Sequence, residues 1–263
     1  MNVIGLIPAR LESTRLPRKL LLRETGKPLI QHVYERVQQA QELSDVFVAT
    51  DSEEIAKVIR DFGGKVVKTG PAASGTDRLA QACQTSECAN FEGIINVQGD
   101  EPEIAVSTIN ALAKTLKAGL DSMVTVAVWE ANQERIKEPS IVKLVLNSQG
   151  YALYFSRSLI PYFREASETG FYRHLGIYGY TRDFLLKYTR WEPTPLEQAE
   201  KLEQLRVLEN GFRIKVLLVQ DDHIGIDVQE DYDRFVKRFK MLASGVLAPE
   251  TLAPEALTHK EGK

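Results

Sequence analysis

The sequence predicts an α/β fold with a mainly parallel central sheet flanked by helices, and two observations lead to it. Strand-like and helix-like segments alternate through the first half of the chain, as expected of βαβ units. The first segment, NVIGLIP at 2–8, is an almost continuous apolar run, which is typical of a strand buried on both faces of a parallel sheet. With 263 residues, the chain is long enough for one large α/β domain or two small ones.

The elements of the first half follow from periodicity and turn signals. A helix is predicted at 28–40, where apolar residues recur on one helical face. Ser52 is the predicted N-cap of the next helix. The further elements, in chain order, are a strand at 45–50, a helix at 52–62, a strand at 64–69, a helix at 76–87 and a strand at 93–98.

After about residue 120 the pattern changes to adjacent strands, at 122–128, 141–156 and 174–181. Turn signals such as SQG between them predict hairpins and mixed pairing. One helix is predicted at 194–211, because apolar residues recur there at three-residue steps and Gly211 is a suitable stop. A strand at 213–219 and a helix at 229–244 follow, and the tail at 245–263 is expected to be poorly ordered.

Composition narrows the function classes. A net charge of −3 does not favour general nucleic-acid binding or a polybasic membrane surface. No apolar run is long enough to span a bilayer, and the first residues do not read as a signal peptide. Cys83 and Cys88, placed inside the predicted third helix, are interpreted as reduced thiols packed as small apolar residues, which indicates a cytoplasmic protein.

A cationic loop follows the first predicted strand. The stretch IPARLESTRLPRK at 7–19 contains four cations, Arg10, Arg15, Arg18 and Lys19. Parallel α/β sheets bind ligands at the carboxyl ends of their strands, and cations there can neutralise phosphates. The Gly-rich phosphate-binding fingerprints are absent, so a solvated basic loop is the alternative interpretation.

Two further segments place carboxylates after strands. INVQGDEP at 95–102 contains Asp100 and Glu101 directly after an apolar run, and Mg²⁺ commonly uses only one or two protein carboxylates together with substrate phosphates. The alternative is an acidic turn. Asp227 in GIDVQED is either a second metal ligand or a helix cap, and the local pattern favours the cap, although Gln229 or Asp231 could serve equally well.

The remaining candidates are weaker when judged locally. SGTDR at 74–78 suits close contact with a base or ribose, but Ser74 or Thr76 could equally be a simple N-cap. His174 lies on a strand interrupted by glycine, where a single histidine is more often structural. Glu203 and Gln204 lie in a predicted amphipathic helix, where such residues are normally solvated.

Taken together, these segments resemble the 3-deoxy-manno-octulosonate (Kdo) cytidylyltransferases over about residues 2–240. The matching stretches, in chain order, are IPAR…STRLP.K (7–19), VATD (48–51), SGTDR (74–78), NVQGDEP (96–102), YALYFSR..IP (151–161), RHLGIYGY (173–180), LEQLRVL (202–208) and GIDVQED (225–231). The stretch RLPRKLL departs from the usual RLPGKPL, so Arg18 replaces a glycine and Leu20 a proline. HIGID at 223–227 also departs from the more frequent GTGVD.

The resemblance implies a Rossmann-like nucleotidyltransferase fold, with a single domain at 1–244 and an inserted smaller mixed sheet region at about 120–190 that contributes to dimer contact. It implies the reaction of CTP with Kdo to give CMP-Kdo and pyrophosphate for lipopolysaccharide biosynthesis, with Mg²⁺ as cofactor, in a cytoplasmic homodimer that binds neither nucleic acid nor membrane. The alternative substrates are 8-amino-Kdo and another acidic sugar such as a nonulosonate.

The resemblance also implies roles for particular residues. Arg15, Lys19 and Asp100 are the expected catalytic residues, and Asp100 and Asp227 the expected Mg²⁺ ligands. The expected nucleotide-binding residues are Ala9, Arg10, Ser13, Arg15, Lys19, Ser74, Gly75, Thr76 and Arg78. The expected sugar-binding residues are Gln98, Arg157, His174, Tyr178, Glu203 and Gln204.

Overall fold

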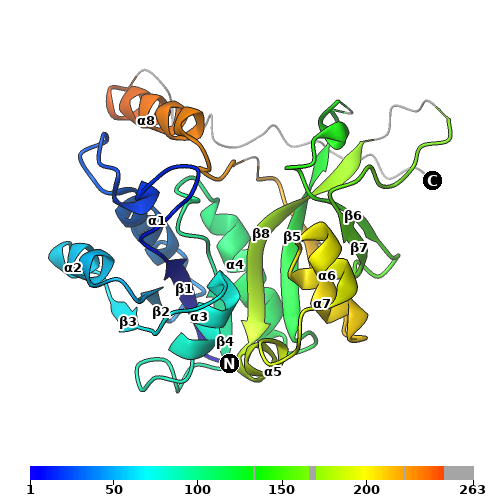
Figure 1. Cartoon of the computed structure of the whole chain (residues 1–263), viewed down its shortest axis with the longest axis horizontal. Coiled ribbons are helices and arrows are strands. Elements are labelled where there is room, and N and C mark those ends of the chain that lie inside the picture. The colour runs from blue at the N-terminus through cyan, green and yellow to red at the C-terminus, as the bar shows by residue number, and fades with distance from the viewer. Residues whose placement is uncertain (133, 166–169, 222, 246–263) are drawn as a thin grey trace.

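The computed structural model describes residues 1–132, 134–165, 170–221 and 223–245. Its nine strands form one sheet in the order β3-β2-β1-β4-β8-β5-β9, while β6 and β7 lie off this path (Figure 1). The strands are β1 (Val3–Ala9), β2 (Asp45–Thr50), β3 (Val66–Lys68), β4 (Gly93–Asn96), β5 (Met123–Glu130), β6 (Lys143–Leu146), β7 (Ala152–Ser156), β8 (Phe171–Thr181) and β9 (Lys215–Leu218).

The first half of the chain forms the parallel part of the sheet, as predicted. β1 pairs in parallel with β2 on one side and β4 on the other, and β2 pairs in parallel with β3. Six of the seven β1 residues are buried, which agrees with its continuous apolar sequence. Because β1, β2 and β4 run in one direction, their carboxyl ends meet at one edge of the sheet.

The second half adds the mixed part of the sheet, as also predicted. β8 is antiparallel to both β4 and β5, and β5 pairs in parallel with β9. β6 and β7 form an antiparallel hairpin, and β6 also pairs with β8. The predicted inserted region is therefore continuous with the main sheet, and the hairpin branches from it.

Helices cover both faces of the sheet (Figure 1). They are α1 (Leu29–Gln38), α2 (Glu53–Asp61), α3 (Gly75–Ala82), α4 (Val106–Lys117), α5 (Arg182–Tyr188), α6 (Pro195–Glu200), α7 (Gln204–Glu209) and α8 (Gln229–Ala243), with short 3-10 turns η1 (Lys19–Leu21) and η2 (Arg135–Lys137). The predicted N-cap Ser52 is confirmed, because its hydroxyl accepts from the Ile55 amide of α2 at 3.2 Å.

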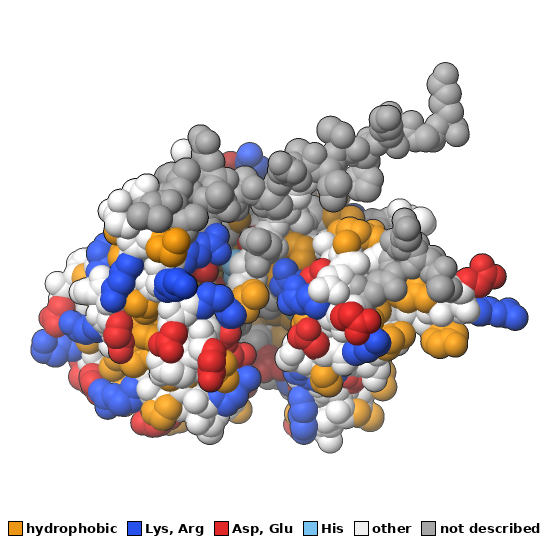
Figure 2. Space-filling view, turned by 90° about the horizontal axis from the view of Figure 1, so that it is seen from above, with side chains coloured by type: hydrophobic (Ala, Val, Ile, Leu, Met, Phe, Trp, Pro, Cys, Tyr) orange, Lys and Arg blue, Asp and Glu red, His pale blue; other side chains and the backbone are white. Residues whose placement is uncertain are grey.

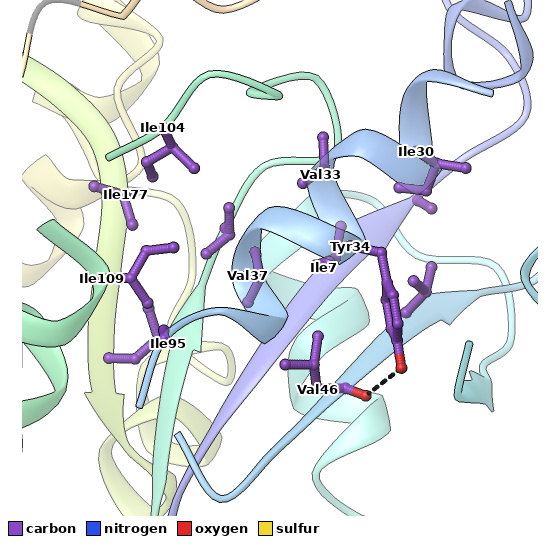
Figure 3. Close-up of a cluster of buried hydrophobic side chains, with 14 of the residues drawn as sticks. Ile7, Ile30, Val33, Tyr34, Val37, Val46, Ile95, Ile104, Ile109 and Ile177 are labelled. Carbon is purple, nitrogen blue, oxygen red and sulfur yellow. Dashed lines mark hydrogen bonds between the residues drawn. The ribbon is translucent and has the colours of Figure 1, made fainter. Parts of the chain in front are cut away.

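The core on the α1 face shows how these helices are fixed. Val33, Tyr34 and Val37 of α1 point onto β1 and β2, and the apolar residues continue through Ile109 of α4 to Ile177 of β8 (Figure 3). The Tyr34 hydroxyl donates to the Val46 carbonyl at 3.3 Å, so this buried polar group has a partner. The face predicted for the helix at 28–40 is confirmed.

α4 and α5 are not predicted by the sequence analysis, which contains no element between 98 and 120. α4 begins after Ala105, which has no side chain to cap a helix. The missing acceptor comes from Asp221, whose carboxylate accepts from the Ala105 amide at 3.1 Å and from the Thr108 hydroxyl at 2.9 Å. A cap 116 positions away leaves no local start signal.

The single helix predicted at 194–211 is wrong, because the chain forms α6 and α7 instead. The helix breaks at Lys201, which has a left-handed backbone with φ 54°. Steps of three residues drift round a helix that has 3.6 residues per turn, so they do not define one face. Leu196 and Ala199 are accordingly exposed, whereas Leu202 and Leu205 are buried.

The placement of the cysteines inside a helix is also wrong. α3 ends at Ala82, and both cysteines lie in the turns that follow. They are free and buried, as predicted, and burial raises the pKa of Cys83 to about 12 and of Cys88 to about 11. Most of the predicted tail at 245–263 lies outside the described residues, and no described helix is long and apolar enough to cross a membrane.

Candidate active site

A pocket of about 440 Å³ opens at the carboxyl edge of β1 and β4. The loops that follow these two strands form two of its walls, and the start of α3 forms a third. Figure 2 looks onto the molecule from above, where Lys and Arg side chains gather around the hollow between its two halves. The pocket thus lies where parallel α/β sheets bind ligands.

Lys19 is the central cation of the pocket. Its Nζ contacts a carboxylate oxygen of Asp100, lies 3.4 Å from Asp227 Oδ1 and donates to the Ile226 carbonyl at 2.7 Å. Its side chain is only 11% exposed, so these contacts are shielded from water. The two carboxylates predicted to hold a metal therefore already converge on one cation.

The other two predicted cations are more accessible. Arg15 places Nη2 at 2.9 Å from Asp227 Oδ1, and its side chain is 64% exposed. Arg10 is exposed, lines the pocket and has no hydrogen bond or ion pair within the described part of the chain. Both guanidinium groups can turn toward a bound anion at little cost.

Arg18 differs from its neighbours because it does not line the pocket. Its guanidinium forms an ion pair with Glu54 of α2, and its backbone is left-handed, with φ 54° and ψ 28°. Glycine adopts this conformation without strain, which explains the glycine usual at this position in RLPGKPL. Arg18, the fourth cation of the loop, therefore joins the loop to α2 by an ion pair.

The structure excludes Asp227 as the cap of α8. The carboxylate of Asp231 accepts from the amides of Asp227 and Val228, at 3.0 and 3.1 Å, and so performs that task. The Asp227 side chain faces the pocket instead, where it contacts Arg15 and Lys19. The local preference for a capping role is therefore wrong, and the metal-ligand alternative stays a prediction.

The SGTDR segment both caps a helix and lines the pocket. Ser74 is the N-cap of α3, since its hydroxyl accepts from the Asp77 amide at 3.2 Å, and Ser74 and Gly75 also line the pocket. The positive end of α3 thus faces the space that an anion would fill. Arg78 is buried and held by Asp51 at 3.0 Å and by the Thr69 hydroxyl at 2.8 Å.

Glu203 also lines the pocket. The break between α6 and α7 places it there, and the Thr76 hydroxyl donates to its Oε2 at 2.7 Å. Thr76 is buried and does not line the pocket. Gln204 is 3% exposed, and its Nε2 has no hydrogen-bond partner among the described residues.

His174 and Tyr178 lie beyond the pocket along β8, with ring centroids 5.4 Å apart. Burial lowers the pKa of His174 to about 3, so the imidazole is neutral at physiological pH. The Thr125 hydroxyl donates to the Ile177 carbonyl at 2.8 Å, so it accepts from His174 Nε2 at 3.0 Å. With this assignment Nδ1 of His174 is an acceptor, and no hydrogen bond joins it to another described residue.

Arg157 does not approach the pocket. Its Nε donates to the Glu200 carbonyl at 2.8 Å and its Nη1 to the Pro139 carbonyl at 3.0 Å. The guanidinium thus spans two loops of the hairpin side of the molecule. Its proposed contact with the carboxylate of a sugar stays a prediction.

Most predicted site residues meet at the pocket, and some pocket residues were not predicted. The predicted residues that line it are Ala9, Arg10, Ser13, Arg15, Lys19, Ser74, Gly75, Arg78, Gln98, Asp100, Glu203 and Asp227. Those that do not are Thr76, Arg157, His174, Tyr178 and Gln204. The lining residues without a predicted role are Pro8, Glu12, Thr14, Leu20, Ala72, Ala73 and Gly99.

Close packing around Gly99 leaves little room for a larger side chain. The sequence indicates this only by a glycine directly after a strand. A Cβ at this position would lie 3.3 Å from the Pro8 carbonyl oxygen and 3.3 Å from Ile30 Cδ1. The loop that contains Asp100 therefore lies directly against the end of β1. This close packing brings Asp100 within reach of Lys19.

The charges of the pocket fit a metal-bound polyphosphate. Its lining contains four cations, Arg10, Arg15, Lys19 and Arg78, and four carboxylates, those of Glu12, Asp100, Glu203 and Asp227. Carboxylates next to a polyphosphate repel it unless a further cation lies between them. Among the described residues, no group of three or more His, Cys, Asp or Glu side chains could hold a metal ion by itself. Asp100 and Asp227 could hold Mg²⁺ if phosphate and water supplied its remaining ligands.

A family model described as cytidylyltransferase matches residues 4–216 of the chain. A 3-deoxy-manno-octulosonate cytidylyltransferase of Fusobacterium nucleatum is 43% identical over 242 residues, covering 91% of this chain and 98% of the relative. An 8-amino-3,8-dideoxy-manno-octulosonate cytidylyltransferase of Shewanella halifaxensis is 46% identical over 234 residues, covering 88% of this chain and 96% of the relative.

A solved structure is also similar over nearly the whole chain. It is that of CMP:2-keto-3-deoxy-manno-octonic acid synthetase complexed with CTP, with a TM-score of 0.86 and 37% sequence identity. The match covers 94% of this chain and all of the other. The fold of this chain is therefore similar to that of a protein whose structure contains CTP.

Proposed function

The chain belongs to the cytidylyltransferase family, and we propose on that basis that it transfers the cytidylyl group of CTP to 3-deoxy-manno-octulosonate, releasing pyrophosphate. The observation that supports this most directly is the meeting of Lys19 with Asp100 and Asp227 at the carboxyl edge of the sheet. A cation and two carboxylates at that edge can hold a triphosphate and its metal together.

The nucleotide is proposed to bind with its triphosphate between the cationic loop and the start of α3. Arg10, Arg15 and Lys19 would pair with phosphate oxygens, and the amide groups at the start of α3 would add further donors. Ala9 and Ser13 on one wall, and the segment from Ser74 to Arg78 on the other, would contact the rest of the nucleotide. Arg78 itself is held by Asp51, so it would act from a fixed position.

Asp100 and Asp227 are the proposed ligands of Mg²⁺. When bound, the metal would supply charge neutralisation at the phosphates and lower the pKa of a hydroxyl that it contacts. Lys19 now pairs with both carboxylates, so it would have to turn toward the phosphates when the nucleotide enters. We therefore expect metal binding to be weak without CTP and stronger with it.

The chemistry needs an in-line attack of the anomeric hydroxyl of the sugar on the α-phosphorus of CTP. The new bond joins that oxygen to the α-phosphorus, the bond to the β-phosphate oxygen breaks, and pyrophosphate leaves with most of the negative charge. Reactions of this type depend chiefly on positioning and charge neutralisation. Arg15 and Lys19 are placed to neutralise the leaving pyrophosphate, and no side chain is assigned as general base.

The sugar is proposed to lie beyond the α-phosphate, toward β8. Gln98 and Glu203 line that side of the pocket, and the free Nδ1 of His174 could accept a sugar hydroxyl. The unpartnered Nε2 of the buried Gln204 could donate to another oxygen. Tyr178 would complete the wall, and Arg157 could contact the sugar carboxylate only if it released at least one of its two carbonyl partners.

8-Amino-Kdo is the second candidate substrate, because the 8-amino-3,8-dideoxy-manno-octulosonate cytidylyltransferase of Shewanella halifaxensis is 46% identical to this chain. Pyrophosphate release separates the candidates when CTP is combined with Kdo, 8-amino-Kdo or N-acetylneuraminate, with and without Mg²⁺. We expect Kdo to give the highest kcat/KM, with no turnover without metal and little when UTP or ATP replaces CTP. A higher kcat/KM for 8-amino-Kdo would select the second candidate, and a preference for N-acetylneuraminate would contradict both.

We also propose a homodimer, formed through the hairpin side of the molecule. Exposed apolar side chains gather there, with Trp129 51%, Leu153 60% and Tyr162 82% exposed. Light scattering of the intact chain at several concentrations tests this, and Trp129→Glu should favour the monomer. We place the reaction in the cytoplasm, where CTP is supplied, and its activated sugar product in lipopolysaccharide biosynthesis.

A further inference from the structure

A buried ionic cluster lies behind the active-site pocket, formed by Glu101, Asp221 and His223. The three residues are 8%, 5% and 6% exposed, and none of them lines the pocket. His223 Nδ1 lies 2.6 Å from Asp221 Oδ1, and His223 Nε2 lies 3.6 Å from Glu101 Oε2. The imidazole therefore stands between two carboxylates in a space that contains little water.

The contacts of the cluster indicate that the imidazole is charged. Burial opposes protonation, but Asp221 and Glu101 outweigh it and raise the pKa of His223 to about 10. Oε2 of Glu101 has no hydrogen-bond partner among the described residues, so the ion pair with His223 is its compensation. The net charge of the three groups is then −1, and it would be −2 without the imidazolium.

The cluster joins the two loops that contain the predicted metal ligands. Glu101 follows Asp100 directly, whereas Asp221 and His223 belong to the loop that ends at Asp227. The same two loops are joined by the Ile226 amide, which donates to the Asp100 carbonyl at 2.9 Å. Asp221 in turn accepts from Ala105 and Thr108 at the start of α4, so one end of the Asp227 loop is fixed to that helix.

We propose that His223 is a positioning residue for the metal site: by joining Glu101 to Asp221, it holds the loop that contains Asp227 against the loop that contains Asp100. The inference rests on the proposed function, because it assumes that Asp100 and Asp227 bind the metal. Glu101 lies in NVQGDEP, one of the stretches that carry the resemblance. Asp221 and His223 lie outside all of those stretches, and HIGID at 223–227 departs from the frequent GTGVD.

The test measures Mn²⁺ binding to the protein with saturating CTP, by the loss of the free-ion electron paramagnetic resonance signal beyond the loss that the same CTP concentration causes without protein. Mn²⁺ takes the same oxygen ligands as Mg²⁺. His223→Gln is expected to weaken Mn²⁺ binding about five- to tenfold, because two buried carboxylates then repel each other and loosen the loop. At saturating metal, kcat should stay within about threefold of the wild type.

A second substitution shows whether His223→Gln weakens Mn²⁺ binding through the lost positive charge or through a general loosening of the loop. Adding Glu101→Gln to His223→Gln returns the net charge of the cluster to −1, and it should recover at least half of the lost affinity on a logarithmic scale. Tyr34→Phe is the matched control, since it removes buried hydrogen bonds to Val46 and Lys65 on the α1 side of the core. Its Mn²⁺ binding should equal that of the wild type.

The outcomes distinguish this inference from the function on which it rests. If the wild type bound no Mn²⁺ with CTP, or Asp227→Asn bound it equally well, the metal site itself would be wrong. If the wild type bound Mn²⁺ and Asp227→Asn did not, the metal site would be supported. Unchanged or tighter Mn²⁺ binding by folded His223→Gln would then contradict only the positioning role of His223. A failure of Glu101→Gln to restore binding would contradict that role as well. Should His223→Gln not fold, Asp221→Asn is measured instead, with about threefold weaker binding expected and unchanged binding as the contrary result.

Discussion

Lys19 donates a hydrogen bond to the Asp100 carboxylate, although 81 positions separate the two residues. The contact exists because β1 and β4 are parallel neighbours, so the loops that follow them start at the same edge of the sheet. Asp227 reaches the same ammonium from a loop 208 positions from Lys19. The pocket therefore forms where these three loops meet the start of α3.

Lys19→Met should lower kcat/KM for CTP by about 100-fold, roughly 3 kcal/mol of transition-state stabilisation, because it removes a shielded cation from the leaving pyrophosphate. Pyrophosphate release measures this. Arg18→Met is the matched control, since Arg18 is the neighbouring cation that pairs with Glu54 and should be dispensable for turnover. A Lys19→Met protein that kept more than a tenth of wild-type kcat/KM would contradict the role given to Lys19.

Asp227→Asn should lower turnover but not stability, whereas Asp231→Ala should lower stability. Asp227 is 49% exposed, and it contacts the exposed Arg15 and, at the longer distance of 3.4 Å, the Lys19 ammonium. Its loss should therefore change the free energy of unfolding little, while it removes most Mg²⁺-dependent turnover. Asp231 caps α8, so its loss should cost about 1 kcal/mol of stability. Urea unfolding and turnover at rising Mg²⁺ concentration test both, and normal turnover by Asp227→Asn at saturating Mg²⁺ would refute its assignment.

Arg18→Gly should be more stable than Arg18→Ala by about 1 kcal/mol. Both variants lose the ion pair with Glu54, but only alanine keeps a Cβ in the left-handed conformation with φ 54°. Because the loss of the ion pair is common to both variants, the difference in their stability reports the backbone strain. Equal midpoints of urea unfolding for the two variants would show that the loop does not hold Arg18 in this conformation.

The stability that His223 contributes should depend on pH in a defined window. Its pKa is raised from 6.5 to about 10 in the folded protein, so the folded state binds the proton more tightly than the unfolded state does. The contribution is therefore complete below pH 6.5 and is lost as the pH rises toward 10. The difference in unfolding free energy between wild type and His223→Gln should shrink between pH 6.5 and 9, and a constant difference would contradict the buried imidazolium.

Local sequence patterns were sufficient for the parallel strands, whereas most pocket residues were assigned only through the resemblance to a family. The apolar run of β1 and the cations and carboxylates after β1 and β4 are adjacent to the elements that place them, so their position could be predicted. Asp227 could not be placed in this way, because its local context favours a helix cap. The structure decides the matter through Asp231, whose carboxylate takes the cap and leaves Asp227 for the pocket.

The failures have physical causes that lie outside a short window of sequence. α4 has no cap of its own, since Asp221 supplies one from 116 positions away. The helix predicted at 194–211 breaks at Lys201, and the break places Glu203 against Thr76 and into the pocket. His174 could be located on a strand, but its neutral state depends on burial that only the packed sheet provides.

Phosphorus NMR of the intact chain with CTP, Kdo and Mg²⁺ tests the central claim most directly, because it reports which phosphorus is attacked. The proposed function predicts that the three CTP signals are replaced by one phosphodiester signal and an equimolar pyrophosphate signal, and that Asp100→Asn abolishes this change. CTP that persisted with Kdo present, or CDP and inorganic phosphate as products, would contradict attack at the α-phosphorus in the pocket formed by Lys19, Asp100 and Asp227.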